Sequence, residues 1–137
     1  MAINDLSRND MGEILKKAKR IAVVGLSDNP NRTSYSVSKA MMDSGYEIIP
    51  INPSVSEVFG VKAYASLLDI DGHVDIVNIF RRSEAVSQHA KEFEQIDADV
   101  FWTQLDVIDE DVYHDLKNKG YTVIMNRCIK VEHALTK

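Results

Sequence analysis

The chain alternates between two patterns of apolar residues. Short runs in which nearly every residue is apolar or β-branched recur along it, at 21–24, 46–51, 75–80, 99–103 and 121–125. The segments between these runs place apolar residues at helical spacing, as Met11, Ile14, Leu15 and Ala18 do. Continuous apolar runs of this length are typical of strands that are covered on both faces, as in a parallel sheet.

The segments between the strands predict helices and polar loops. We expect helices over 10–18, from about 33 to Gly45, from Ser83 onward, over 109–119 and over 127–135, a helical turn at Leu67-Leu68, and loops over 26–34 and 54–65. Strands that alternate with helices imply crossover connections, which are right-handed and keep the strands parallel.

The predicted fold is therefore α/β, a Rossmann-like, doubly wound, five-stranded parallel sheet with helices on both faces. Numbering the strands along the chain, we expect the order 3-2-1-4-5. This order puts the topological switch point between the first and fourth strands, where ligands bind outside the carboxyl ends. The length of 137 residues predicts one domain over 1–137.

Composition narrows the function. The net charge is -5, so broad affinity for nucleic acid or anionic lipid is not expected. The lone Cys128 cannot form an internal disulfide, and the stretch 1–10 has no apolar core for a signal peptide. The apolar runs are too short to span a bilayer. We therefore expect a cytoplasmic protein.

Four arginines follow closely after predicted strands. They are Arg32, Arg81, Arg82 and Arg127. Because parallel strands end at one edge of the sheet, these guanidinium groups are expected to gather there, where they suit a phosphate site. A local positive patch on an acidic chain indicates a compact, polyphosphorylated small molecule.

The loop 25–36 is the first candidate site. Gly25 allows a tight turn beside a ligand, Thr33 or Ser34 is a natural helix N-cap, and Arg32 adds a charge beside the free amides of the helix start. An ordinary strand-to-helix loop explains the same residues equally well.

The stretch 80-FRRSE-84 is the second candidate. Arg81 or Arg82 could clamp a phosphate beside the apolar wall of Phe80. The competing interpretation is a solvated arginine pair followed by Ser83 as a helix cap.

Two further stretches follow the last two strands. In 102-WTQLD-106, Trp102 could line an apolar channel and Gln104 could bind amides, although core packing explains Trp102 at least as well. In 126-NRC-128, Asn126 and Arg127 supply donors, and Cys128 lies near a helix start that would favour a thiolate. A buried, inert cysteine is the simpler interpretation.

Several classes of site are not expected. A dinucleotide fingerprint needs further glycines and an acid after the second strand, whereas this chain has only Gly25 and ends that strand in Asn52-Pro53. There is no Walker A motif, Ser-His-Asp triad or evident carboxylate pair. The four histidines lack metal-ligand spacing, so no metal site is expected.

Taken together, these loops resemble a known family. The stretches 23-VVGLSDNPNRTSYSV-37, 45-GYEIIPINP-53, 75-DIVNIFRRSE-84, 102-WTQL-105 and 126-NRCIKVE-132 are similar, in order and spacing, to the small single-domain CoA-binding proteins. Those proteins are similar to the N-terminal domain of succinyl-CoA synthetase alpha subunits. The resemblance implies a Rossmann-like sheet that binds coenzyme A at its carboxyl edge, without the synthetase's catalytic histidine domain.

The resemblance also implies roles for particular residues. Gly25, Ser27, Arg32 and Ser34 would hold phosphates, Asn52 and Pro53 would shape the nucleotide side, and Phe80, Arg81 and Arg82 would meet the nucleotide or its phosphates. Trp102, Gln104, Asn126, Arg127 and Cys128 would lie nearer the pantetheine arm. Asp106 departs from the family pattern, which has glycine there, and could narrow the site or repel the ligand.

Three functional hypotheses remain open. The leading one is a protein that binds CoA or an acyl-CoA without evident catalytic machinery. The second is a thiol or redox switch in which Cys128 forms a mixed disulfide with CoA. The third is an NAD(P)-type nucleotide sensor. A homodimer is a further expectation, because the sheet is small.

Overall fold

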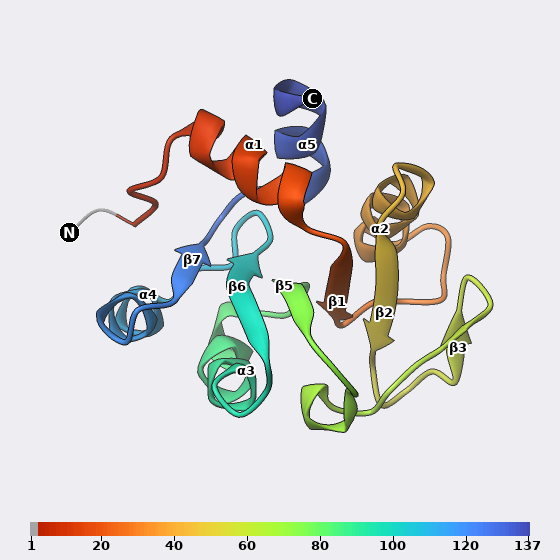
Figure 1. The fold of residues 1–137 in the computed structure, drawn as a ribbon. Coiled ribbons are helices and arrows are strands. Elements are labelled where there is room, and N and C mark those ends of the chain that lie inside the picture. The colour runs from red at the N-terminus through yellow and green to blue at the C-terminus, as the bar shows by residue number, and fades with distance from the viewer. Residues whose placement is uncertain (1–2) are drawn as a thin grey trace.

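In the computed structural model, which describes residues 3–137, five parallel strands form one sheet (Figure 1). Their order is β2 (Glu47–Ile51), β1 (Arg20–Val24), β5 (Val74–Ile79), β6 (Ala98–Thr103) and β7 (Thr122–Ile124). Every neighbouring pair in this sheet is parallel. Residues 1 and 2, the start of the stretch predicted not to be a signal peptide, lie outside the described part of the chain.

Helices follow the strands as the pattern predicts. They are α1 (Arg8–Lys17), α2 (Thr33–Asp43), α3 (Val86–Phe93), α4 (Glu110–Asn118) and α5 (Ile129–Thr136), with short 3-10 turns η1 (Leu67–Asp69) and η2 (Ser83–Ala85). Within residues 3–137, no helix has the length and apolar character needed to cross a membrane.

The helices cover both faces of the sheet. Helices α1, α2 and α5 lie on one face, and α3 and α4 lie on the other (Figure 1). Alternate residues of a strand point to opposite faces, so Ile21 and Val23 pack with the first group while Ala22 and Val24 pack with the second. The predicted fold class is confirmed.

The strand order differs from the prediction of 3-2-1-4-5. Numbered along these five strands, the observed order is 2-1-3-4-5, because β5 pairs with both β1 and β6. Pro50 in β2 has no N–H to donate, which suits an edge strand. By contrast, β5 is buried on both faces, which suits the centre. The switch point therefore lies between β1 and β5.

The stretch predicted as a plain loop over 54–65 contains a small hairpin. Strands β3 (Glu57–Val58) and β4 (Val61–Lys62) pair antiparallel. Phe59 and Gly60 form the turn, with φ of 57° and 75°. A two-residue turn with both φ values positive is a favoured hairpin connection. The hairpin leads to Tyr64, whose amide donates to the carbonyl of Pro50 and so attaches the segment to the sheet edge.

Candidate functional site

A cleft of about 1050 Å³ opens at the carboxyl edge of the sheet. Loops after β1, β2, β5 and β6 surround it, so it lies across the switch point. We call it the carboxyl-edge cleft; its lining comes from 24–25, 32–34, 51–54, 65–66, 80–82, 88–89, 92 and 104–107. The cleft is open enough for an extended ligand and exceeds the usual volume of a drug-sized pocket, roughly 300–1,000 Å³.

Three arginines line this cleft without a carboxylate partner. The side chains of Arg32, Arg81 and Arg82 are exposed, and within residues 3–137 none forms an ion pair. Arg8 and Arg20, outside the cleft, pair with Glu132 and Glu47 respectively. Positive charge at the carboxyl edge is thus left available to an anionic ligand.

Gly25 lets the loops after β1 and β5 approach closely. Its φ is +84°, and a Cβ at this position would lie 2.4 Å from the carbonyl oxygen of Phe80. Only glycine fits such a contact in the left-handed region. This close approach brings Arg81 and Arg82 beside the first loop.

The start of α2 contributes its N-terminus to the cleft. The N-cap is Arg32, not the predicted Thr33 or Ser34, and no side chain caps the helix. Ser34 is buried, and its Oγ instead accepts a hydrogen bond of 3.1 Å from the amide of Ser27. Because the first amides of a helix have no partner within it, this end attracts an anion.

Both polar groups of the Asn52 side chain form hydrogen bonds within the protein. Its Nδ2 donates to the carbonyl of Leu26 at 3.0 Å, and its Oδ1 accepts from the amide of Ser54 at 2.9 Å. The side chain thereby ties the loop after β2 to the loop after β1. Asn52 and the exposed Pro53 both line the cleft.

The segment after β6 supplies the wall opposite Gly25. Gln104 is 7% exposed and lines the cleft, and its Oε1 has no hydrogen-bond partner among the described residues. Trp102 is completely buried in the core beneath α1, α2 and α5. Its Nε1 donates to the carbonyl of Arg127 at 2.9 Å, which joins the ends of β6 and β7.

Asn126 supports the same wall of the cleft through two hydrogen bonds. Its Oδ1 accepts a hydrogen bond of 2.7 Å from the backbone amide of Asp106, and the backbone amide of Asn126 donates to Thr103 Oγ1 at 3.2 Å. Asp106 lines the cleft and has a φ of +68°, in the region that favours glycine. Ser83, predicted as a helix cap, instead accepts from the amide of Ile108 at 2.9 Å.

The structure brings most of the predicted site residues together. Those that line the cleft are Gly25, Arg32, Ser34, Asn52, Pro53, Phe80, Arg81, Arg82 and Gln104. Those outside its lining are Ser27, Trp102, Asn126, Arg127 and Cys128. Cys128 is 9% exposed and packs among the apolar residues beneath α1 and α5.

A histidine and a glutamate in the cleft were not predicted as site residues. His89 and Glu92, both on α3, line the cleft with Ser66. His89 Nδ1 lies 2.7 Å from Glu92 Oε1, and Ser66 Oγ donates to Glu92 Oε2 at 3.3 Å. The spacing of three residues on a helix could have indicated the pair, but Ser66 comes from a distant turn.

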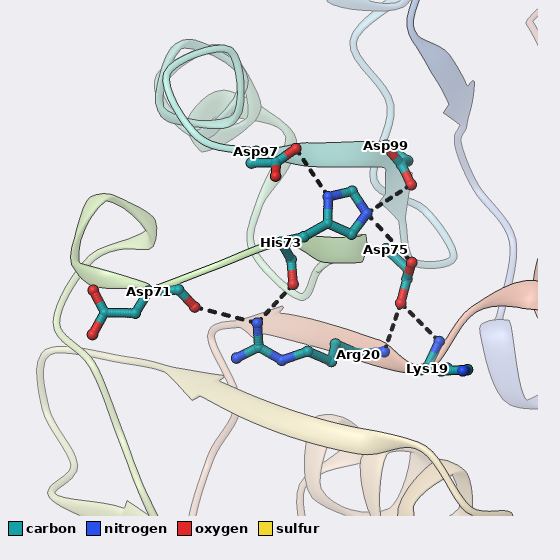
Figure 2. Close-up of polar contacts among 7 residues, drawn as sticks. All are labelled: Lys19, Arg20, Asp71, His73, Asp75, Asp97 and Asp99. Atoms are coloured by element: carbon teal, nitrogen blue, oxygen red, sulfur yellow. Dashed lines mark hydrogen bonds and ion pairs between the residues drawn. The ribbon is translucent and has the colours of Figure 1, made fainter.

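A second polar cluster lies at the opposite, amino edge of the sheet. Figure 2 shows the ring of His73 among three carboxylates, those of Asp75, Asp97 and Asp99. Its Nδ1 is 2.9 Å from Asp97, and its Nε2 is 2.9 Å from Asp99 and 3.4 Å from Asp75. The hydrogen bond to Asp97, with help from Asp99, raises the pKa of His73 above its ordinary value.

Backbone groups fix one member of this cluster. The amides of Lys19 and Arg20 donate to one oxygen of Asp75 (Figure 2). Burial raises the pKa of Asp75, but these two hydrogen bonds, together with the charge of His73 and its hydrogen bond, lower it overall. His73, Asp75 and Asp99 bring metal-ligand atoms within 4.8 Å of one another, a grouping that sequence spacing missed because it spans two strands.

Comparison with known proteins agrees with this geometry. A protein of Bacillus subtilis, the uncharacterized protein YneT, is 60% identical over 131 residues, 96% of this chain and 97% of that protein. A Pyrococcus horikoshii structure superposes with a TM-score of 0.93 at 31% identity, covering 99% of this chain and 96% of that one. A Thermus thermophilus structure gives a TM-score of 0.92 at 32% identity, covering 96% of this chain and 100% of that one.

Part of a larger enzyme is also similar to this chain. The ADP-forming acetate–CoA ligase of Methanocaldococcus jannaschii is 36% identical over 61 residues, which are 44% of this chain but only 9% of the ligase. A family model described as the CoA binding domain matches residues 19–134. The match covers all five strands of the sheet and every segment that lines the cleft. The chain therefore belongs to the CoA-binding domain family.

Proposed function

We propose that this protein binds coenzyme A, free or acylated, in the carboxyl-edge cleft. The observation that carries the proposal is the set of three guanidinium groups, Arg32, Arg81 and Arg82, that line the cleft without a carboxylate partner. CoA carries a 3′-phosphate and a pyrophosphate, and such groups accept charge-assisted hydrogen bonds from arginine. Membership of the family supports the same ligand.

The backbone around the cleft also supports an anionic ligand. The uncapped start of α2 places backbone amides beside Arg32, and the close approach at Gly25 brings the loop that carries Arg81 next to the first loop. A pair of charge-assisted contacts contributes about 3–6 kcal/mol before ordering costs. That contribution supports roughly micromolar affinity.

The Cys128 redox switch has less support. The thiol is buried among apolar side chains and does not line the cleft. A mixed disulfide with CoA would require the start of α5 to move away from the core. A lone buried thiol suits a reducing compartment, so a cytoplasmic location stays a prediction. A homodimer also stays a prediction.

Substitution of the arginine pair tests the phosphate assignment. In the double variant Arg81→Ala/Arg82→Ala, CoA affinity should fall by roughly 30-fold or more, because two charge-assisted bonds are lost. Both side chains are exposed and unpaired, so the melting temperature without ligand should stay near that of the parent. Isothermal titration calorimetry measures the affinity.

Lys130→Ala provides the charge control. Lys130 is exposed on α5 and does not line the cleft. This variant should bind CoA as the parent does. Equal affinity in all three proteins would show that the arginines do not hold the ligand.

A further inference from the structure

His89 has a polar atom that the protein itself leaves unused. The residue is 6% exposed, and its Nε2 is buried without a hydrogen-bond partner among the described residues. Leaving a buried polar atom unsatisfied costs free energy, because the atom has lost its hydrogen bonds to water without gaining one in the protein. Because His89 lines the carboxyl-edge cleft, a small rotation of its side chain would bring this atom to a ligand there.

The chemistry of Nε2 follows from the partner of the other ring nitrogen. An ionised carboxylate can only accept hydrogen bonds, so the proton of a neutral imidazole lies on Nδ1, which faces Glu92 at 2.7 Å. Nε2 is then a bare acceptor. Ser66 donates to the second oxygen of Glu92 and holds the carboxylate in place.

Gln104 lines the same cleft and carries a second unpartnered acceptor. Its Oε1 is buried and unpartnered, and the residue is 7% exposed. Two bare acceptors, Nε2 and Oε1, require a ligand that supplies N–H or O–H groups. Phosphate oxygens are themselves acceptors, so these atoms do not suit the part of the ligand that the arginines attract.

We propose that His89 and Gln104 form a separate recognition point that binds uncharged N–H or O–H donors of the ligand. The proposal rests on the CoA-binding function above and assigns a second chemistry to the same cleft. In CoA, the candidate donors are the hydroxyl and amides of the pantetheine arm and the amine of the adenine. In the complex, these donors would satisfy the two unpartnered atoms.

His89→Phe tests the recognition point directly. Phenylalanine keeps the ring but removes the acceptor, so CoA affinity should fall roughly 3- to 10-fold, the loss of one neutral hydrogen bond. His114→Phe is the matched control. Its Nε2 is also buried and unpartnered, but it lies on α4 outside the cleft lining, so affinity should not change.

Binding of adenosine 3′,5′-bisphosphate, a fragment of CoA without the pantetheine arm, shows which part of CoA donates to His89. If His89→Phe weakens this fragment as well as CoA, the donor belongs to the nucleotide. If only CoA is weakened, the donor belongs to the pantetheine arm. Parent-like affinity of His89→Phe for both ligands would overturn the inference.

A spectroscopic measurement separates this inference from the proposed function. Long-range ¹H–¹⁵N NMR of the unaltered protein should show His89 with its proton on Nδ1 and a bare Nε2, whether or not CoA binds. A proton on Nε2 in the ligand-free protein would overturn the acceptor assignment. Failure of CoA to bind the unaltered chain would instead refute the proposed function and, with it, CoA as the donor-bearing ligand.

Discussion

At the scale of single residues, Asp106 places a negative charge in the cleft that Arg32, Arg81 and Arg82 line. It is exposed, lines the cleft and has a φ of +68°, where aspartate is tolerated and glycine is favoured. The carboxylate and the arginines therefore oppose one another in their effect on a phosphate ligand. The positive φ would account for the glycine that the family resemblance implies at this position, because glycine adopts this φ freely.

Asp106→Gly should bind CoA roughly 2- to 5-fold more tightly than the parent, because it removes a like charge from the cleft. The free energy of unfolding should change by less than about 1 kcal/mol, since relief of the left-handed conformation offsets the flexibility of glycine. Asp106→Asn separates the causes: it removes the charge but keeps a side chain, and it should recover most of the gain. Parent-like affinity of both variants would show that the charge does not act on the ligand.

His73 gives the amino edge a pH-dependent contribution to stability. Its pKa is raised in the folded state by Asp97 and Asp99, so the protonated ring stabilises the fold. This contribution is fully present below the unfolded value of about 6.5 and is lost as pH rises through the folded pKa.

Urea denaturation of the parent and His73→Asn tests this contribution. At about pH 5.5 the variant should be less stable than the parent, and the difference should shrink by about pH 9. Asp75, Asp97, Asp99 and Arg20 are the charged groups around the ring, and all are retained in the variant. An equal stability difference at both pH values would contradict the account.

At the scale of elements, the loop after β6 depends on β7 for its shape. The side chain of Asn126 accepts from the amide of Asp106, and the indole of Trp102 donates to the carbonyl of Arg127. Residues predicted to touch the ligand therefore hold the wall of the cleft in place. Short motifs do not distinguish a residue that contacts a ligand from one that supports such a contact.

Asn126→Gly keeps the positive φ of 59° and removes the side-chain acceptor. We expect a loss of about 1 kcal/mol in unfolding free energy and roughly 3-fold weaker CoA binding, because the amide of Asp106 loses its partner. Asn126→Asp retains an acceptor at the same place and should keep the parent's unfolding free energy, while its added negative charge should weaken CoA binding slightly. If the glycine variant binds CoA normally, the wall does not need this support.

The sequence predicted most elements but not all of their arrangement. Apolar runs and helical spacing were enough for the strands and helices, because each pattern is local. Strand order depends on pairing between distant segments, although Pro50 already indicated that β2 is an edge strand. The hairpin had one short signal, the Phe59-Gly60 turn, and the Ser66–Glu92–His89 contacts had none beyond the spacing on α3.

At the scale of the whole molecule, the two edges of the sheet carry opposite charge. Unpaired arginines gather at the carboxyl edge, whereas Asp75, Asp97 and Asp99 lie at the amino edge around His73. A chain with a net charge of -5 can therefore still guide an anionic ligand to one end. Such a separation of charge would allow an acidic protein to bind the polyphosphorylated ligand proposed above.

Calorimetric titration of the unaltered protein with CoA tests the central claim most directly, with NADH as a competitor. The account predicts saturable heat with one site per chain, weaker binding of dephospho-CoA, and no displacement of CoA by NADH. No heat and no thermal shift with either CoA or dephospho-CoA at millimolar concentration would contradict it.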